Sequence, residues 1–203
     1  DLYSDTATRP TAGMRKAMAD ARVGDEQKGE DPSTSALQER AARLLGKEAA
    51  VFLPSGTMCN QIALLVHCRP GDEILAPDIA HIFTSEAGGG AALCGAQNRM
   101  LPAENGIFTP DAVRAALRDP KSRHTPRSRL VAIEQTVNFG GGAVWPLAAI
   151  EAVAKEARRH GLAVHMDGAR ILNAVAASGV PAARMGAHVD SLWLDLSKGL
   201  GCP

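Results

Sequence analysis

The sequence has no excess of either charge. Its 22 lysines and arginines are balanced by 22 aspartates and glutamates, so the formal net charge is +0. Nucleic acids and anionic membrane surfaces both attract proteins that carry a basic excess. The balance therefore predicts that the protein binds neither a nucleic acid nor a membrane.

Long apolar runs and cysteine clusters are missing as well. No apolar stretch approaches the roughly 20 residues that a membrane-spanning helix needs. The four cysteines are widely spaced, with no Cys-x-x-Cys pair: Cys59, Cys68, Cys94 and Cys202. A chain of 203 residues with 45% hydrophobic composition can bury a core without disulfides. We therefore expect reduced thiols in a cytoplasmic protein.

Two nucleotide-binding signatures are also absent. The turn at residues 55–57 is not followed by the Gly-Lys-Ser/Thr of a Walker motif, and Leu93 stands where the third glycine of a dinucleotide fingerprint would follow Gly88 and Gly90. A second glycine run at residues 140–142 precedes Trp-Pro and indicates a turn. These absences exclude the common phosphate loops of nucleotide-binding folds.

What the chain does have is an alternation of short apolar runs and amphipathic segments. The apolar runs predict strands over residues 49–53, 73–76, 100–101, 130–133, 162–166 and 191–196. The other segments predict helices over residues 32–46, 57–67, 82–88, 109–119 and 146–160, and an exposed basic loop over 121–129. Uniformly apolar strands are usually buried on both faces, so the pattern predicts an α/β fold with a mostly parallel sheet flanked by helices.

Polar residues follow these predicted strands directly, where ligands of open α/β sheets bind. They are Ser55, Gly56, Thr57, Asp78, His81, Glu134, Asp167, Arg170, Ser197 and Lys198. They comprise acids, a cation, an amine and a turn suited to a phosphate, and this combination predicts one site at one edge of the sheet. The alternative is that they are unrelated loop residues.

Each part of the predicted site also has a purely structural interpretation. The helix that starts at residues 55–57 offers free N–H groups to a phosphate, but Ser and Thr are ordinary N-caps. Asp167 can keep a pyridine nitrogen protonated, or it can pair with Arg170 and fasten a turn. Lys198 can act as a Schiff-base amine, or it can be a solvated surface lysine.

Several sequence blocks favour the functional interpretation of these residues. The blocks are 4–10 (SDTATRP), 24–25 (GD), 29–32 (GEDP), 54–60 (PSGTMCN), 80–82 (AHI), 165–170 (HMDGAR) and 196–201 (LSKGLG). In this order the chain resembles the threonine aldolases, fold-type I pyridoxal-phosphate (PLP) enzymes in the wider group of β-eliminating lyases. The resemblance implies that residues 1–203 form the PLP-binding large domain, with an N-terminal segment over 1–30, and that a small C-terminal domain is not covered.

The resemblance implies PLP as the cofactor and a set of residues that hold it. Lys198 would form the Schiff base, Asp167 would pair with the pyridine nitrogen, and His81 would stack on the ring. The phosphate contacts would come from Gly56, Thr57 and Asn60.

Substrate roles are implied in the same way, and no metal is. Ser4 and Arg170 would bind the substrate carboxylate, with Arg170 also near the ring hydroxyl. The base at the β-hydroxyl would be His124, with Glu86 as the second candidate. Two positions depart from the family pattern, since Lys28 replaces a usual tyrosine and Gln135 a usual asparagine.

The implied function is a PLP-dependent aldolase that cleaves threonine or other L-β-hydroxy-α-amino acids into glycine and an aldehyde. One alternative is a related PLP lyase that acts by β-elimination, or an aldolase that prefers phenylserine. Another is a non-catalytic binding protein on the same scaffold, although the retained Lys198 argues against it. The family also implies a homodimer or homotetramer.

Overall fold

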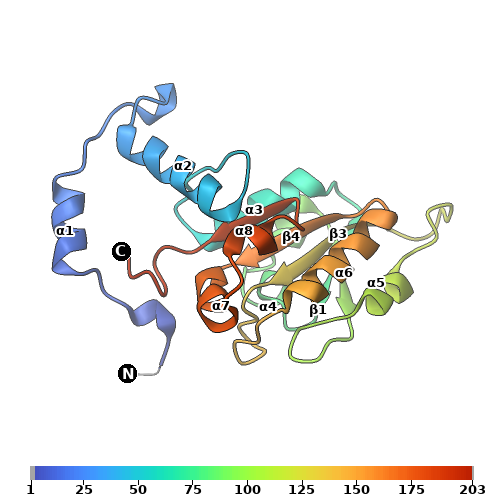
Figure 1. Ribbon diagram of the computed structural model, residues 1–203. Helices are drawn as coiled ribbons and strands as arrows, with labels where there is room; N and C mark the ends of the chain where they lie inside the picture. The colour runs from blue at the N-terminus through green and yellow to red at the C-terminus, as the bar shows by residue number, and fades with distance from the viewer. Residues whose placement is uncertain (1–2, 203) are drawn as a thin grey trace.

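One parallel sheet organises the computed structural model, which describes residues 3–202 (Figure 1). Its strands are β1 (Asp72–Pro77), β2 (Gln97–Leu101), β3 (Arg127–Glu134), β4 (Ala163–Gly168) and β5 (Ser191–Leu194). They lie in the order β2-β1-β3-β4-β5, and every neighbouring pair is parallel. The predicted α/β class and parallel sheet are confirmed.

Helices cover both faces of the sheet. One face packs on α3 (Gly56–His67), α4 (His81–Thr84) and the π-helical turn η3 (Gly90–Cys94). The other packs on α5 (Pro110–Ala116), α6 (Leu147–Arg159), α7 (Ile171–Ser178) and α8 (Ala182–Gly186). Because side chains alternate along a strand, Leu130 and Ala132 of β3 join the first layer, while Val131 and Ile133 join the second.

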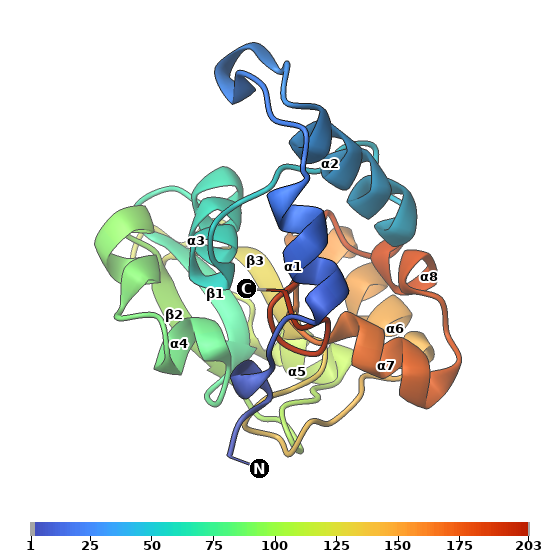
Figure 2. The ribbon, with the colours of Figure 1, turned by 90° about the vertical axis from the view of Figure 1, so that its left-hand side faces the viewer.

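The N-terminal part lies outside these layers, except for the end of its last helix. It contains η1 (Asp5–Ala7), α1 (Ala12–Ala19), η2 (Glu26–Lys28) and α2 (Pro32–Leu45). The end of α2 packs on α8 through Leu45. Helix α1 has no buried residue, and both views place it beside the last residues of the chain (Figures 1 and 2). The Thr8 hydroxyl donates to the carbonyl oxygens of Ser197 at 2.7 Å and Lys198 at 2.8 Å, which fastens this part to the segment after β5.

Capping chemistry sets the start of α2 and α5 as predicted. Asp31 caps α2 by accepting from the Thr34 N–H at 2.8 Å, Pro32 is its first residue, and Gly46 follows with φ +65°. Thr109 caps α5 in the same way, but this helix ends at Ala116 instead of continuing to residue 119. The helices α1, α7 and α8 were not predicted, because their apolar patterns are short.

Other segments differ from the predictions as well. Residues 49–53 form no strand, and Val51 and Phe52 are 68% and 51% exposed, because an apolar run pairs only where a neighbouring strand is available. The predicted helix over 82–88 shrinks to α4, since Ala87 and Gly88 adopt positive φ. β5 ends at Leu194 instead of residue 196, and β3 begins at Arg127, inside the predicted loop.

Two further findings concern the cysteines and the helices. All four cysteines are free thiols. Among residues 3–202 there is no helix with the length and apolar character needed to cross a lipid bilayer.

Candidate functional site

The carboxyl ends of β1, β3 and β4 bring acids and a histidine together. Glu134 and Asp167 are register partners at the ends of β3 and β4, and His81 follows β1. The Glu134 carboxylate accepts from the backbone N–H groups of His81 at 3.1 Å and Asn138 at 2.7 Å. Burial raises the pKa of Glu134, and the nearby charge of Asp167 raises it further.

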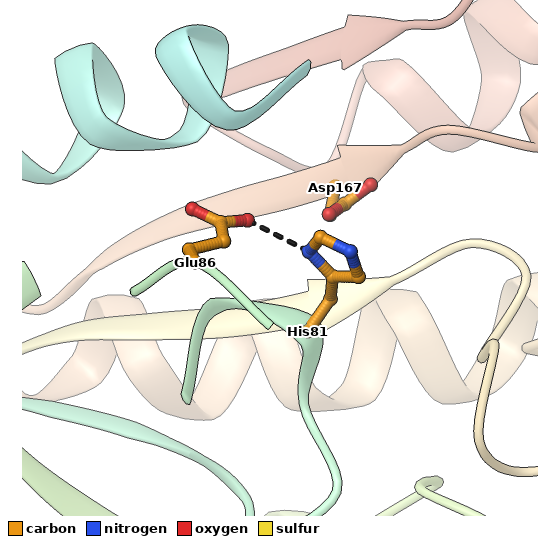
Figure 3. Close-up of side chains that lie close together, drawn as sticks. All are labelled: His81, Glu86 and Asp167. Atoms are coloured by element: carbon orange, nitrogen blue, oxygen red, sulfur yellow. Dashed lines mark hydrogen bonds and ion pairs between the residues drawn. The ribbon is translucent and has the colours of Figure 1, made fainter. Parts of the chain in front are cut away.

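His81 and Glu86 form a direct pair next to Asp167 (Figure 3). The His81 Nδ1 atom lies 2.8 Å from Glu86 Oε1, with the imidazole 30% exposed and the Glu86 side chain fully buried. The hydrogen bond to Glu86 raises the pKa of His81, against the opposing effect of burial. One ligand-type atom from each of the three side chains lies within 4.8 Å of the others, and a direct hydrogen bond joins two of them, His81 and Glu86.

Asn60 of α3 joins Glu86 and Asp167 through hydrogen bonds. Its Nδ2 atom donates to Glu86 at 2.6 Å and to Asp167 at 2.8 Å. Burial raises the pKa of Asp167, and the Asn60 hydrogen bond is the largest influence in the opposite direction. Asp167 is therefore a buried carboxylate that neutral donors hold in place, since its other donor is the backbone N–H of Ala169 at 3.1 Å.

Lys198 lies just beyond β5, on the same side of the sheet as Asp167. Its side chain is 15% exposed, and its amine is 3.3 Å from the Asp195 carboxylate and 5.7 Å from the centroid of the Trp193 ring. Trp193 is the register partner of Asp167 and donates its indole N–H to Asn60 at 2.8 Å. Asp167 and the Trp193 ring that Lys198 contacts thus lie on adjacent strands and both bind Asn60, and Lys198 is not a fully solvated lysine.

The N-terminus of α3 lies next to this cluster. Ser55 caps the helix by accepting from the Met58 N–H at 3.2 Å, and Thr57 in the first turn is exposed. A Cβ atom at Gly56 would come within 2.2 Å of the Trp193 ring. The close approach at Gly56 is therefore a contact between α3 and the indole that lies beneath Lys198.

Arg170 pairs with the N-terminal segment and not with Asp167. Its Nη2 atom is 3.0 Å from Asp5 Oδ1, with a second contact between Nε and Oδ2. The alternative in which Arg170 and Asp167 fasten a turn is wrong. The Ser4 hydroxyl lies beside this pair in sequence and contacts the Thr6 hydroxyl at 2.8 Å.

His124 is not brought to the cluster within one chain. It is exposed in the loop before β3, at the amino end of that strand, whereas Glu134 marks its carboxyl end. Seven residue steps of about 3.3 Å each separate Arg127 from Glu134, which is roughly 23 Å.

Two other predicted roles do not match the contacts of the side chains. Both Glu86 oxygens are occupied, Oε1 by Asn60 and His81 and Oε2 by Gln61 at 2.6 Å, so Glu86 is a partner of His81 and not an open base. Asn60 is fully buried under Asp167 and has no contact left for a phosphate. The sequence places Glu86 and Asn60 near the site but does not predict the direction in which their side chains point.

Several contributing residues were not predicted. They are Gln61, His165, Ser191 and Trp193. The sequence did hold a signal, because alternate residues of a strand face the same side. His165 and Asp167 are two apart in β4, and Ser191 and Trp193 are two apart in β5, so these strand residues all face α3. Two adjacent polar residues in the middle of α3, Asn60 and Gln61, mark the facing surface.

Comparisons with known proteins show the family and the fold of the chain. The model of the beta-eliminating lyase family matches residues 1–203. The chain is 44% identical over 206 residues to low-specificity L-threonine aldolase 1 of Arabidopsis thaliana and 43% identical over 204 residues to the low specificity L-threonine aldolase of Escherichia coli K12. All of this chain aligns, but only 58% and 60% of those proteins. The threonine aldolase structure from Leishmania major superposes with a TM-score of 0.82 at 24% identity, over 94% of this chain and 56% of that one, and so shares the fold.

Proposed function

Because the chain belongs to the beta-eliminating lyase family along residues 1–203, we propose that it forms the cofactor-binding part of a PLP-dependent aldolase. The enzyme would cleave threonine and related L-β-hydroxy-α-amino acids to glycine and an aldehyde. One observation carries the proposal. A buried carboxylate, Asp167, lies at the end of β4, and the amine of Lys198 lies over the indole that is the carboxylate's register partner.

The residues present fit PLP chemically. Among residues 3–202, Asp167 accepts hydrogen bonds only from neutral groups, Asn60 and the Ala169 N–H, so its charge suits a protonated ring nitrogen. The amine of Lys198 would hold the cofactor covalently, and Gly56 and Thr57 at the N-terminus of α3 would hold its phosphate. When bound, PLP supplies an electron sink for the pair released as the Cα–Cβ bond breaks.

We propose His81 as the side chain that accepts the β-hydroxyl proton. Its Nδ1 atom contacts Glu86, which orients the ring and favours its protonated form, so that Nε2 is the nitrogen left for proton transfer. Glu86 acts through His81 as a positioning residue. His124 can contribute only from another copy of the chain, since it lies at the amino ends of the strands and the site lies at their carboxyl ends.

Arg170 is proposed to bind the substrate carboxylate, with Ser4 nearby. The support is its existing contact, because the guanidinium already holds the Asp5 carboxylate through two nitrogens. A substrate carboxylate would replace or share that contact.

The experiment that tests the function uses the purified full-length enzyme with PLP. Incubation with L-threonine should release acetaldehyde and glycine in equal amounts, and incubation with phenylserine should release benzaldehyde. The family name keeps β-elimination as the second candidate, and that reaction would release ammonia. Ammonia without aldehyde would replace the aldolase by an eliminating lyase, and no turnover of any of these substrates would remove both.

We also propose a homodimer or homotetramer in the cytoplasm. Large apolar side chains are exposed on α3 and on the segment before it: Val51, Phe52, Met58, Ile62, Leu65 and Val66. The free thiols suit a reducing compartment. Light scattering on the full-length enzyme tests the first prediction, since a monomeric mass would contradict it, and cell fractionation tests the second.

A further inference from the structure

A line of hydrogen bonds, buried near Asp167 and half-buried at Ser191 and His67, leads away from Asp167 toward the far end of α3. We propose that this chain of donors, running from His67 through Ser191, His165 and Asn60, holds the Asp167 carboxylate as an anion aimed at a cationic ring nitrogen. Asn60 is then a positioning residue for the cofactor. The inference rests on the proposed function, because the ring nitrogen belongs to PLP.

The orientation of the Asn60 amide fixes the direction of the whole chain. Its Nδ2 side faces two carboxylates, Glu86 at 2.6 Å and Asp167 at 2.8 Å. Its Oδ1 atom faces the indole N–H of Trp193 at 2.8 Å and His165 Nε2 at 3.0 Å. An amide turned the other way would set oxygen against both carboxylates and NH₂ against the indole N–H, so only one orientation satisfies all four contacts.

The direction then propagates through His165. Because Asn60 Oδ1 can only accept, His165 Nε2 must carry a proton and donate. In a neutral imidazole Nδ1 is then an acceptor, so the Ser191 hydroxyl 2.8 Å away donates to it. The Ser191 oxygen in turn accepts from His67 Nε2 at 2.7 Å. Every hydrogen bond of the chain therefore donates toward Asp167.

Burial keeps the histidines of this hydrogen-bond chain neutral and strengthens its effect on Asp167. Asn60 is 0% exposed, His165 2% and Asp167 5%. Burial lowers the pKa of His165 to about 3 and also lowers the pKa of His67, so both imidazoles are neutral near pH 7. Burial raises the pKa of Asp167, and the Asn60 bond opposes that effect. Aligned donors in a region of low dielectric strengthen one another, so they stabilise the anion.

The same amide links Asp167 to the histidine of the site. Its second hydrogen goes to Glu86 Oε1, the atom that also contacts His81 Nδ1. Asn60 thus positions the group proposed to meet the ring nitrogen and, through Glu86, the proposed base.

The test compares two cofactors on the full-length enzyme. One is PLP, and the other is its 1-deaza analogue, which has carbon in place of the ring nitrogen. We expect Asn60→Ala to weaken PLP binding roughly tenfold to a hundredfold, measured by absorbance titration, and to change binding of the analogue less than about twofold. A merely structural role for Asn60 would weaken both cofactors equally, and that result would overturn the inference.

If Asn60→Ala does not fold, variants with smaller structural effects test the same inference. His165→Phe removes the donor to Asn60 at similar size and should weaken PLP binding roughly threefold to tenfold, while His165→Gln, which can still donate there, should restore it. Ser191→Ala should weaken PLP binding about twofold, whereas the matched Ser178→Ala, whose hydroxyl bonds only the Ala174 carbonyl and the Val180 N–H, should not.

The outcomes separate the two proposals. Wild-type enzyme that binds neither cofactor would remove the proposed function, and this inference with it. Wild type that binds both, with His165→Phe and His165→Gln equally impaired or with PLP and the analogue equally affected, would remove the inference alone.

Discussion

The two ends of the central strands treat buried carboxylates in opposite ways. At the amino ends, Asp72 meets Arg127 through two bonds of 2.9 and 3.0 Å, and Glu73 meets Arg118 at 3.2 Å. At the carboxyl ends, Asp167 and Glu134 accept hydrogen bonds from backbone N–H groups and, for Asp167, from the Asn60 amide. Within residues 3–202, neither of these two acids forms an ion pair with a lysine or an arginine.

This difference separates stabilising charges from functional ones. A guanidinium compensates the charge of its carboxylate, so no negative charge is left for a cationic ligand to pair with. Neutral donors fix the position of a carboxylate but leave its charge uncompensated, which suits a cationic ligand atom. The comparison therefore predicts large effects on cofactor chemistry at the carboxyl ends and effects on stability alone at the amino ends.

The largest effect is expected from Lys198→Ala. Full-length wild type with PLP should show a visible absorption band that borohydride bleaches and fixes covalently, and the variant should show no covalent fixation at all, because no other amine is proposed for the site. Mass spectrometry after borohydride treatment measures it. Covalent label that persists on the variant would place the reactive amine elsewhere in the chain.

Asp167→Asn should come next. The amide keeps the shape but cannot hold a ring nitrogen in its protonated form, so we expect kcat/KM for threonine to fall roughly a hundredfold to a thousandfold. Steady-state aldehyde release measures it, with circular dichroism to check folding. A loss of less than about threefold would mean that the uncompensated charge at this end has no catalytic role.

The sequence predicts these two groups because each follows an apolar strand. The runs at 130–133 and 162–166 form interior strands, and residues 191–194 form the edge strand β5, so the residues after them meet at the carboxyl ends of one parallel sheet. The run at 49–53 is as apolar, but composition alone does not supply a neighbouring strand, and the segment stays exposed.

The remainder of the site depends on packing that no local pattern encodes. Asn60 matches a phosphate-loop motif in sequence, yet the pairing of α3 with β4 and β5 turns its side chain toward Asp167. His124 and Lys198 are both polar residues beside strands. His124 precedes β3 and therefore lies at the amino ends of the strands. Lys198 follows β5 and therefore lies at the carboxyl ends.

A smaller effect is expected at the His81–Glu86 pair. The Glu86 hydrogen bond raises the pKa of His81 above its ordinary value of 6.5. The neutral imidazole that is needed as a base therefore predominates only at a pH above this raised pKa. Glu86→Gln should lower that pKa, so the acid limb of the kcat profile should move to lower pH, while kcat at high pH falls roughly tenfold because the ring is held less firmly. An acid limb that stays in place would exclude His81 as the base.

The smallest effect is expected at the amino ends, from Asp72→Asn. Burial opposes the charge of Asp72, but the bonds from Arg127 and from the Arg69 N–H outweigh it, and its pKa lies below the ordinary 3.8. A lowered pKa means that the pair stabilises the fold above pH 4 and loses this contribution as the pH falls through the folded-state pKa. We expect the variant to lose about 1 kcal/mol in the free energy of unfolding at pH 7, because Arg127 is largely exposed and solvent screens the pair. Urea denaturation at pH 7 and pH 3 measures the difference, which should shrink at pH 3, while the cofactor absorption band and kcat stay those of wild type. If instead kcat dropped with unchanged stability, the two ends of the sheet would not divide stability from chemistry as the pairing of their carboxylates indicates.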